Sequence, residues 1–94
     1  MSDSRYNGWT NWETWLFKLW LENYEHMYHK IRELTISSKD SMELANKLED
    51  MAWKMQKNSI EHQSGFFADV TNKAIQAINY YELADAYIND LDNN

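Results

Sequence analysis

The chain has 94 residues, of which 44% are hydrophobic and 15% aromatic, and its formal net charge is −6 at pH 7. This length predicts a single domain over residues 1–94, and the apolar content is too high for intrinsic disorder. Cysteine is absent, which excludes disulfides and thiolate sites. Because no apolar run is long enough for a membrane span and the N-terminus lacks the pattern of a signal peptide, we expect a soluble cytoplasmic protein.

Negative charge is concentrated in the last third of the chain. Residues 65–94 carry five acidic side chains against one basic side chain, Lys73. Direct binding of nucleic acid requires clusters of lysine and arginine, so we expect none. An acidic surface keeps a small protein soluble, and it can also imitate the charge of nucleic acid. The residues of such an acidic surface would be Asp69, Glu82, Asp85, Asp90 and Asp92.

The chain opens with an aromatic segment. Four of the five tryptophans lie within residues 6–20: Trp9, Trp12, Trp15 and Trp20. Since each buried indole supplies roughly 150–250 Å² of contact area, this segment organises either the core or a binding surface. Asn7-Gly8 predicts a tight turn with positive φ at Gly8. That turn bends residues 1–9 into an aromatic arm, so that Trp9 packs over the following helix.

The rest of the chain has the apolar spacing of helices throughout. Three residues precede apolar stripes and have glutamate three positions later, the pattern of a capping box: Thr10, Asp40 and Asn79. The first helix is predicted over residues 11–22. Further apolar stripes run over residues 24–34, 44–55, 67–78 and 80–91. The predicted fold class is therefore all-α, a compact bundle of four to five helices.

The first predicted helix has more apolar residues than one stripe needs. Trp12, Leu16, Leu19 and Trp20 share one side of it. Either this helix is central and packed on several sides, or part of it is exposed for a partner. We favour the central helix. The residues expected to be largely buried are Trp12, Leu16, Trp20, Leu48, Ala52, Ala74, Leu83 and Tyr87.

Trp53 stands apart from the apolar stripe of its helix, which is centred near Leu48 and Ala52. An indole on a charged face is either covered by another segment or exposed as an anchor for a partner, and tryptophan is strongly enriched at interface hot spots. The candidate partner-binding residues are Trp53, Lys54, Lys57 and Phe17.

The sequence contains no pattern typical of a metal or catalytic site. His26 and His29 have a spacing that can place two imidazoles on one metal ion, but the third histidine, His62, is distant in the sequence. No nucleophile–base pair and no phosphate-binding glycine loop is present. We therefore expect a protein that is not an enzyme and has no catalytic residues, no metal and no cofactor.

Two stretches resemble a family of small, uncharacterised proteins of phages, plasmids and bacteria. Residues 6–15, Tyr-Asn-Gly-Trp-Thr-Asn-Trp-Glu-Thr-Trp, resemble the opening N-G-[WY]-T-N-[WY]-E-T-W of these proteins. Residues 78–84, Ile-Asn-Tyr-Tyr-Glu-Leu-Ala, are similar to their ending [IV]-N-[WY]-x-E-[IL]-A, with Tyr80 where tryptophan is frequent. The resemblance implies a mobile genetic element, and the host cytoplasm if a phage encodes the protein. It implies no established activity, although proteins of this size in such settings often bind a host enzyme.

We therefore expect a protein that binds a host protein through a helical surface and inhibits or modulates a host enzyme or complex. Two alternatives stay open. The first is an acidic mimic of nucleic acid that inhibits a restriction, CRISPR or other nucleic-acid enzyme. The second is a homo-oligomeric structural module that buries its surplus aromatic side chains against a second copy.

Overall fold

A computed structural model describes residues 6–23, 25–59 and 65–92. They form the helices α1 (Trp12–Asn23), α2 (Glu25–Ser37), α3 (Ser41–Ser59), α4 (Phe66–Ala77) and α5 (Tyr80–Asp92). Over these ranges there is no strand, and one isolated bridge pairs Tyr6 with Trp9. The predicted all-α bundle is confirmed. None of the helices in the described ranges is long and apolar enough to cross a membrane.

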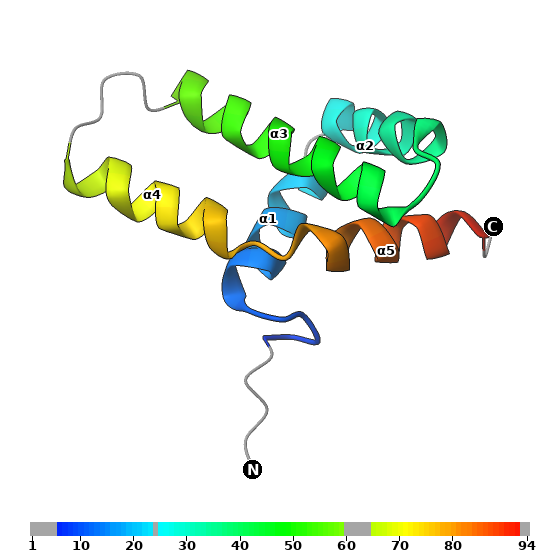
Figure 1. Cartoon of the computed structure of the whole chain (residues 1–94), viewed down its shortest axis with the longest axis horizontal. Helices are drawn as coiled ribbons and strands as arrows, with labels where there is room; N and C mark the ends of the chain where they lie inside the picture. The colour runs from blue at the N-terminus through cyan, green and yellow to red at the C-terminus, as the bar shows by residue number, and fades with distance from the viewer. Residues whose placement is uncertain (1–5, 24, 60–64, 93–94) are drawn as a thin grey trace, which may run out of the picture.

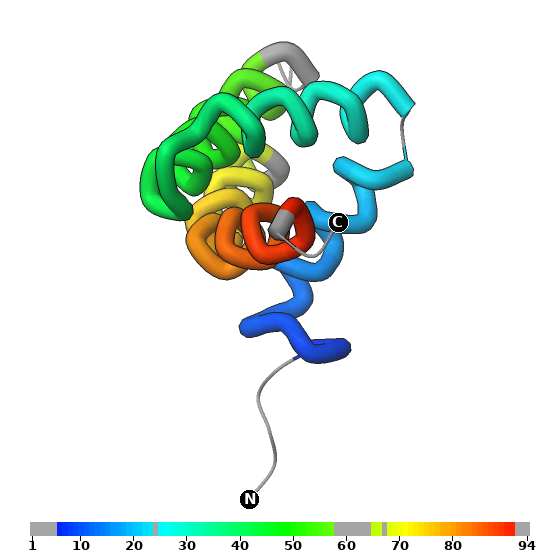
Figure 2. Tube along the Cα trace, turned by 90° about the vertical axis from the view of Figure 1, so that its right-hand side faces the viewer, coloured from blue at the N-terminus to red at the C-terminus, as the bar shows by residue number. Residues whose placement is uncertain are grey.

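The helices form two layers that α1 crosses. In Figure 1, α2 and α3 lie above, α4 and α5 follow one another below, and α1 runs across them from the N-terminal arm to α2. Figure 2, a quarter turn away, shows α1 rising from the arm beside α5. The most extensive packing between two helices is that of α3 against α5. This pair forms the centre of the fold.

The hydrophobic core lies mainly between α3 and α5. It is made chiefly by the apolar stripes of α3 and α5, and among the described side chains α1, α2 and α4 each add one buried apolar residue. The buried apolar residues are Leu21, Ile31, Leu44, Ala45, Leu48, Met51, Ala52, Ile75, Tyr80, Leu83 and Ala84. The predicted burial of Leu48, Ala52 and Leu83 is confirmed. Leu16, Ala74 and Tyr87 are partly buried.

The prediction that Trp12 and Trp20 are buried is wrong, because their side chains are 48% and 50% exposed. The inward face of α1 carries Thr14 and Leu21 instead, at 0% and 1% exposure. These two positions are seven apart and therefore lie on one side of the helix. The side with Trp12 and Trp20 turns toward solvent.

Two of the three predicted capping residues begin helices as expected. Asp40 Oδ1 accepts a hydrogen bond from the Glu43 amide at 2.9 Å, and Asn79 Oδ1 accepts one from the Glu82 amide at 3.0 Å. At α1 the prediction is off by one residue. Asn11, not Thr10, is the cap, since its Oδ1 accepts from the amide of Thr14 at 2.9 Å.

The aromatic arm forms the predicted turn. The amide of Tyr6 donates to the carbonyl of Trp9 at 2.7 Å, and the amide of Trp9 donates back at 2.8 Å. Asn7 and Gly8, with φ of 49° and 88°, occupy the two central positions, as in a type I′ hairpin turn. Trp9 packs against the core, and Lys18 Nζ of α1 lies 5.7 Å from the centre of its ring.

Candidate functional site

The two sequence motifs, at opposite ends of the chain, meet where α1 begins and α4 passes into α5. The hydroxyl of Thr14 donates to Asn11 Oδ1 at 2.6 Å and accepts from the Asn79 amide at 2.8 Å. Asn11 Nδ2 donates to the carbonyl of Ala77 at 2.7 Å. Each of these side chains thus binds both its own helix end and the other segment. The start of α1 is fixed against the α4–α5 junction.

A second pair of hydrogen bonds closes the same junction. The amide of Thr10 donates to Glu82 Oε1 at 2.9 Å, and Asn79 Nδ2 donates to Thr10 Oγ1 at 3.1 Å. In a capping box, glutamate returns to the amide of its own capping residue, whereas Glu82 here accepts from the amide of Thr10. Five polar residues of the two motifs therefore hold the junction together: Thr10, Asn11, Thr14, Asn79 and Glu82.

This junction sets the rotation of α1 about its axis. With Thr14 held against α5, the side of α1 that turns outward carries Trp12, Leu16 and Trp20. These residues are four apart and form one row along the helix. The row faces the space between α3 and α4.

A groove of about 290 Å³ lies there, between α1, α3 and α4. Its lining is almost wholly apolar, and Glu13 is the one charged side chain among the described residues that form it. On one side of the groove, Gln56 Nε2 of α3 donates to Asn72 Oδ1 of α4. The lining residues are Trp12, Glu13, Leu16, Phe17, Trp20, Ala52, Met55, Gln56, Thr71, Ala74, Ile75 and Ile78.

A family model described as a family of unknown function (DUF7249) matches residues 2–93. The chain belongs to this family. Comparisons with curated proteins and with solved structures found no match. Membership of DUF7249 names no activity.

Of the four residues predicted to bind a partner, Phe17 lines the groove and the other three lie on α3 outside it. Phe17 lines the groove and makes an edge-to-face contact with Tyr80, with ring centres 6.0 Å apart. Trp53 is partly buried against the core, and its Nε1 donates to Glu49 Oε2 at 3.5 Å. Lys54 and Lys57 are exposed on α3 outside the groove.

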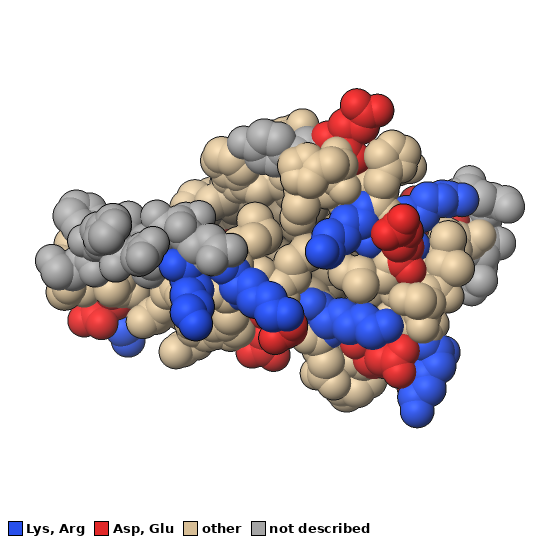
Figure 3. Space-filling model, turned by 90° about the horizontal axis from the view of Figure 1, so that it is seen from above, with Lys and Arg blue, Asp and Glu red and all other residues tan. Residues whose placement is uncertain are grey.

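The five residues of the predicted acidic surface have different surroundings. Asp69 and Asp90 are exposed, and the side chain of Asp92 lies outside the described part of the structure. Glu82 accepts from the amide of Thr10 at 2.9 Å, and Asp85 accepts from the hydroxyl of Ser41 at 3.1 Å. Glu82 and Asp85 thus form hydrogen bonds within the fold. The face seen in Figure 3, formed largely by α2 and α3, carries basic and acidic residues side by side.

The histidines of α2 lie on the surface. His26 and His29 are exposed, and His29 Nε2 lies 3.9 Å from Glu25 Oε1 in the preceding turn. His62 falls outside the described residues. Among the residues that the structure does describe, no three His, Cys, Asp or Glu side chains are grouped so that they could hold a metal ion.

Sequence reasoning missed Trp12 and Trp20 as surface residues. The signal that could have found them was the surplus of apolar side chains on the first helix, which is larger than one buried stripe requires. Both alternatives, a central helix and an exposed one, fitted that surplus. The hydrogen bond that decides between them joins the Asn79 amide to the Thr14 hydroxyl. These two residues are 65 positions apart in the sequence.

Proposed function

We propose that this protein acts by binding another protein, and that the groove between α1, α3 and α4 receives an amphipathic helix of that partner. The observation that carries the proposal is the exposure of Trp12 and Trp20, at about half of each side chain, along an almost wholly apolar groove. Contiguous apolar surface of this kind marks interaction sites, and tryptophan is strongly enriched at interface hot spots.

The shape of the groove favours a helix as its occupant. Its walls are three helices, and the row Trp12, Leu16 and Trp20 has the four-residue spacing of a helical ridge. Such a ridge packs into the groove between the side-chain rows of a second helix. A partner helix with an apolar face would cover the two indoles and place its apolar side chains between α3 and α4.

Charge favours a partner helix with basic flanks. The chain has a net charge of −6, Glu13 lies in the groove, and Asp69 is exposed on α4. Basic residues beside the apolar face of the partner would complement these carboxylates and speed association. A second copy of this acidic chain lacks that complementarity, which disfavours self-association through the groove.

The resemblance to small proteins of phages, plasmids and bacteria supports a host protein as the partner. Occupation of a helix that the host protein needs elsewhere would inhibit or modulate it by steric occlusion. This role requires no catalytic group in the groove, in agreement with the apolar lining. Binding, not catalysis, is therefore the proposed activity.

A synthetic helix tests the groove before the natural partner is known. The probe is a fluorescently labelled amphipathic peptide with leucine on one face and lysine on the other, and the measurement is fluorescence anisotropy. The double variant Trp12→Ala/Trp20→Ala should bind at least about thirtyfold more weakly than the wild type, since hot-spot truncation typically costs about 2 kcal/mol or more. Trp53→Ala, which removes an indole outside the groove, is the matched control and should keep the affinity.

A peptide of the same composition in scrambled order, without an apolar face, controls for attraction between charges alone. Equal binding of the scrambled peptide, or equal affinity of wild type and double variant, would contradict the proposal. Sedimentation of the free protein tests the self-associated alternative, which predicts a dimer that the double variant abolishes. Once a natural partner is known, loss of binding in Asp85→Asn/Asp90→Asn/Asp92→Asn with an unaffected double variant would favour the acidic mimic.

A further inference from the structure

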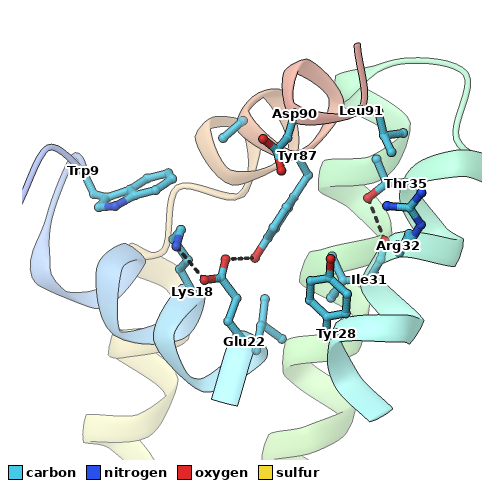
Figure 4. A pocket seen from close by; sticks show the side chains of 12 residues that line it. Trp9, Lys18, Glu22, Tyr28, Ile31, Arg32, Thr35, Tyr87, Asp90 and Leu91 are labelled. Carbon is cyan, nitrogen blue, oxygen red and sulfur yellow. Dashed lines mark hydrogen bonds and ion pairs between the residues drawn. The ribbon is translucent and has the colours of Figure 1, made fainter. Parts of the chain in front are cut away.

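The molecule has a second cavity that shares no lining residue with the groove. It has a volume of about 420 Å³ and lies between α1, α2 and α5, with Trp9 of the arm at its edge (Figure 4). Trp9, Tyr28 and Tyr87 give it three aromatic walls, and Ile31 and Leu91 are among its aliphatic residues. A volume of this order is typical of small-molecule sites, which combine apolar walls with a few polar groups.

One side of this pocket is fixed by internal hydrogen bonds. Lys18 Nζ donates to Glu22 Oε1 at 2.7 Å, and the hydroxyl of Tyr87 donates to Glu22 Oε2 at 3.2 Å. Figure 4 shows Tyr87 reaching from α5 across to α1, where it meets Glu22. Both carboxylate oxygens of Glu22 therefore already have partners, and the ammonium group of Lys18 is neutralised. A ligand finds no unbalanced charge on this side.

The opposite side carries an unbalanced charge. The ion pairs within the described ranges join Lys18 to Glu22, His29 to Glu25, Lys47 to Glu43 and Lys54 to Asp50. Arg32 of α2 takes part in none of them, and it lines the pocket on the side of Tyr87 away from Trp9 (Figure 4). The neighbouring hydroxyl of Thr35 donates to the Ile31 carbonyl at 2.7 Å. Asp90, at the α5 edge of the pocket, has an interaction of its own.

We propose that this pocket binds a small planar aromatic anion, with the ring against the aromatic walls and its carboxylate or phosphate on Arg32. The guanidinium group is planar and offers paired donors that match either anion. On the Arg32 side, Tyr28 and Tyr87 supply the aromatic rings, which favour an aromatic body over an aliphatic one (Figure 4). Since the chain as a whole is acidic, attraction of an anion depends on this local cation.

Four naphthalene probes test the proposal: naphthoate, naphthyl phosphate, naphthylmethanol and naphthylmethylammonium. Each is titrated into ¹⁵N-labelled protein and followed by chemical-shift changes of backbone amides. Naphthoate or naphthyl phosphate should shift amides of the pocket, such as those of Ile31 and Ala86, and the tighter of the two identifies the preferred anion. The uncharged and cationic probes should bind there at least about tenfold more weakly.

Matched variants separate the charge of Arg32 from the overall charge of the protein. Arg32→Gln should weaken anion binding at least about tenfold, while Lys30→Gln, on the same helix but outside the pocket, should leave it unchanged. Tyr28→Ala should also weaken binding, because it removes a wall without changing charge. The double variant Trp12→Ala/Trp20→Ala should retain binding, which keeps this test independent of the groove.

Three outcomes would overturn the proposal. The first is that both anions shift only amides of the groove. The second is that Arg32→Gln and Lys30→Gln have equal effects. The third is that naphthylmethylammonium binds the pocket as tightly as the anions. Melting temperatures establish that each variant is folded. Arg32 and Tyr28 are exposed, so their substitution should leave the fold intact.

Discussion

The apolar stripes in two halves of this molecule differ in how far they are buried. In α3 and α5 the stripes face each other, and Leu44, Leu48 and Leu83 are completely buried. In α1 and α4 large apolar side chains remain on the surface, among them Trp12, Trp20 and Val70. The sequence has helical apolar stripes in both halves, and α1 has more apolar residues than one buried stripe needs. An apolar stripe therefore identifies a surface that becomes covered, but not whether this chain or a partner covers it.

This difference in burial arises from the polar contacts of α1. Thr14, with a fully buried side chain, connects α1 to the start of α5 and turns its own face of α1 inward. Trp12 and Trp20 lie on the other side. The hydrogen bonds at the junction of α1, α4 and α5 thus determine which apolar residues enter the core. Substitutions in the two halves should differ accordingly.

The largest loss of stability is expected in the α3–α5 half. Leu83→Ala removes a fully buried side chain from its centre and should lower the free energy of unfolding by about 2–5 kcal/mol. Urea denaturation measures the loss. Leu19→Ala on α1, where the side chain is 40% exposed, is the matched control and should lower it by a much smaller amount. Equal losses would show that the two halves are packed alike.

The next largest effect is expected where the halves are joined. Thr14→Val keeps the shape of the side chain but removes the hydroxyl that binds both Asn11 and Asn79. The Asn79 amide is then left without its acceptor, so the free energy of unfolding should fall by about 1–3 kcal/mol. Thr10→Val, which removes an exposed acceptor of Asn79 Nδ2, should have less effect. The opposite order would contradict the assigned role of Thr14.

Much of this arrangement could be predicted from local sequence, and some could not. Asp40 and Asn79 cap helices as predicted, and the Asn7-Gly8 turn forms, because each depends on neighbours within a few residues. The exposure of Trp12 depends on contacts between distant segments, which periodicity does not contain. The groove was therefore not predicted, although Phe17, one of its lining residues, was among the candidates.

A smaller loss of stability is expected on the exposed face of α1. Since the side chain of Trp12 is about half exposed, Trp12→Ala should lower the free energy of unfolding by no more than about 2 kcal/mol, below the about 3–5 kcal/mol of a buried aromatic. The same substitution should weaken partner binding. Chemical denaturation and anisotropy on one sample measure both. A loss as large as that of Leu83→Ala would place Trp12 in the core.

The smallest effect at neutral pH is expected at Tyr87, on the side of α5 that faces α1 across the pocket. Tyr87→Phe removes one hydrogen bond to the exposed Glu22 and should change the free energy of unfolding by about 1 kcal/mol or less. Its larger effect is on pH dependence. Burial, and then the negative charge of Glu22 and the hydrogen bond to it, raise the pKa of Tyr87 above its ordinary value of about 10.

The direction of that pH dependence follows from the raised pKa. The folded protein keeps the Tyr87 hydroxyl protonated while the unfolded chain begins to ionise near pH 10, so the stabilisation from this group is fully present below about pH 10. It is lost as the pH rises further toward the folded pKa. The melting temperature of the wild type should therefore fall more steeply above pH 10 than that of Tyr87→Phe. Burial also raises the pKa of Tyr80, whose hydroxyl donates to the Ile75 carbonyl at 2.7 Å, so Tyr80→Phe/Tyr87→Phe should have a still flatter profile. Parallel profiles for wild type and Tyr87→Phe would mean that Tyr87 ionises alike in the folded and unfolded states, and that its contact with Glu22 is not maintained in solution.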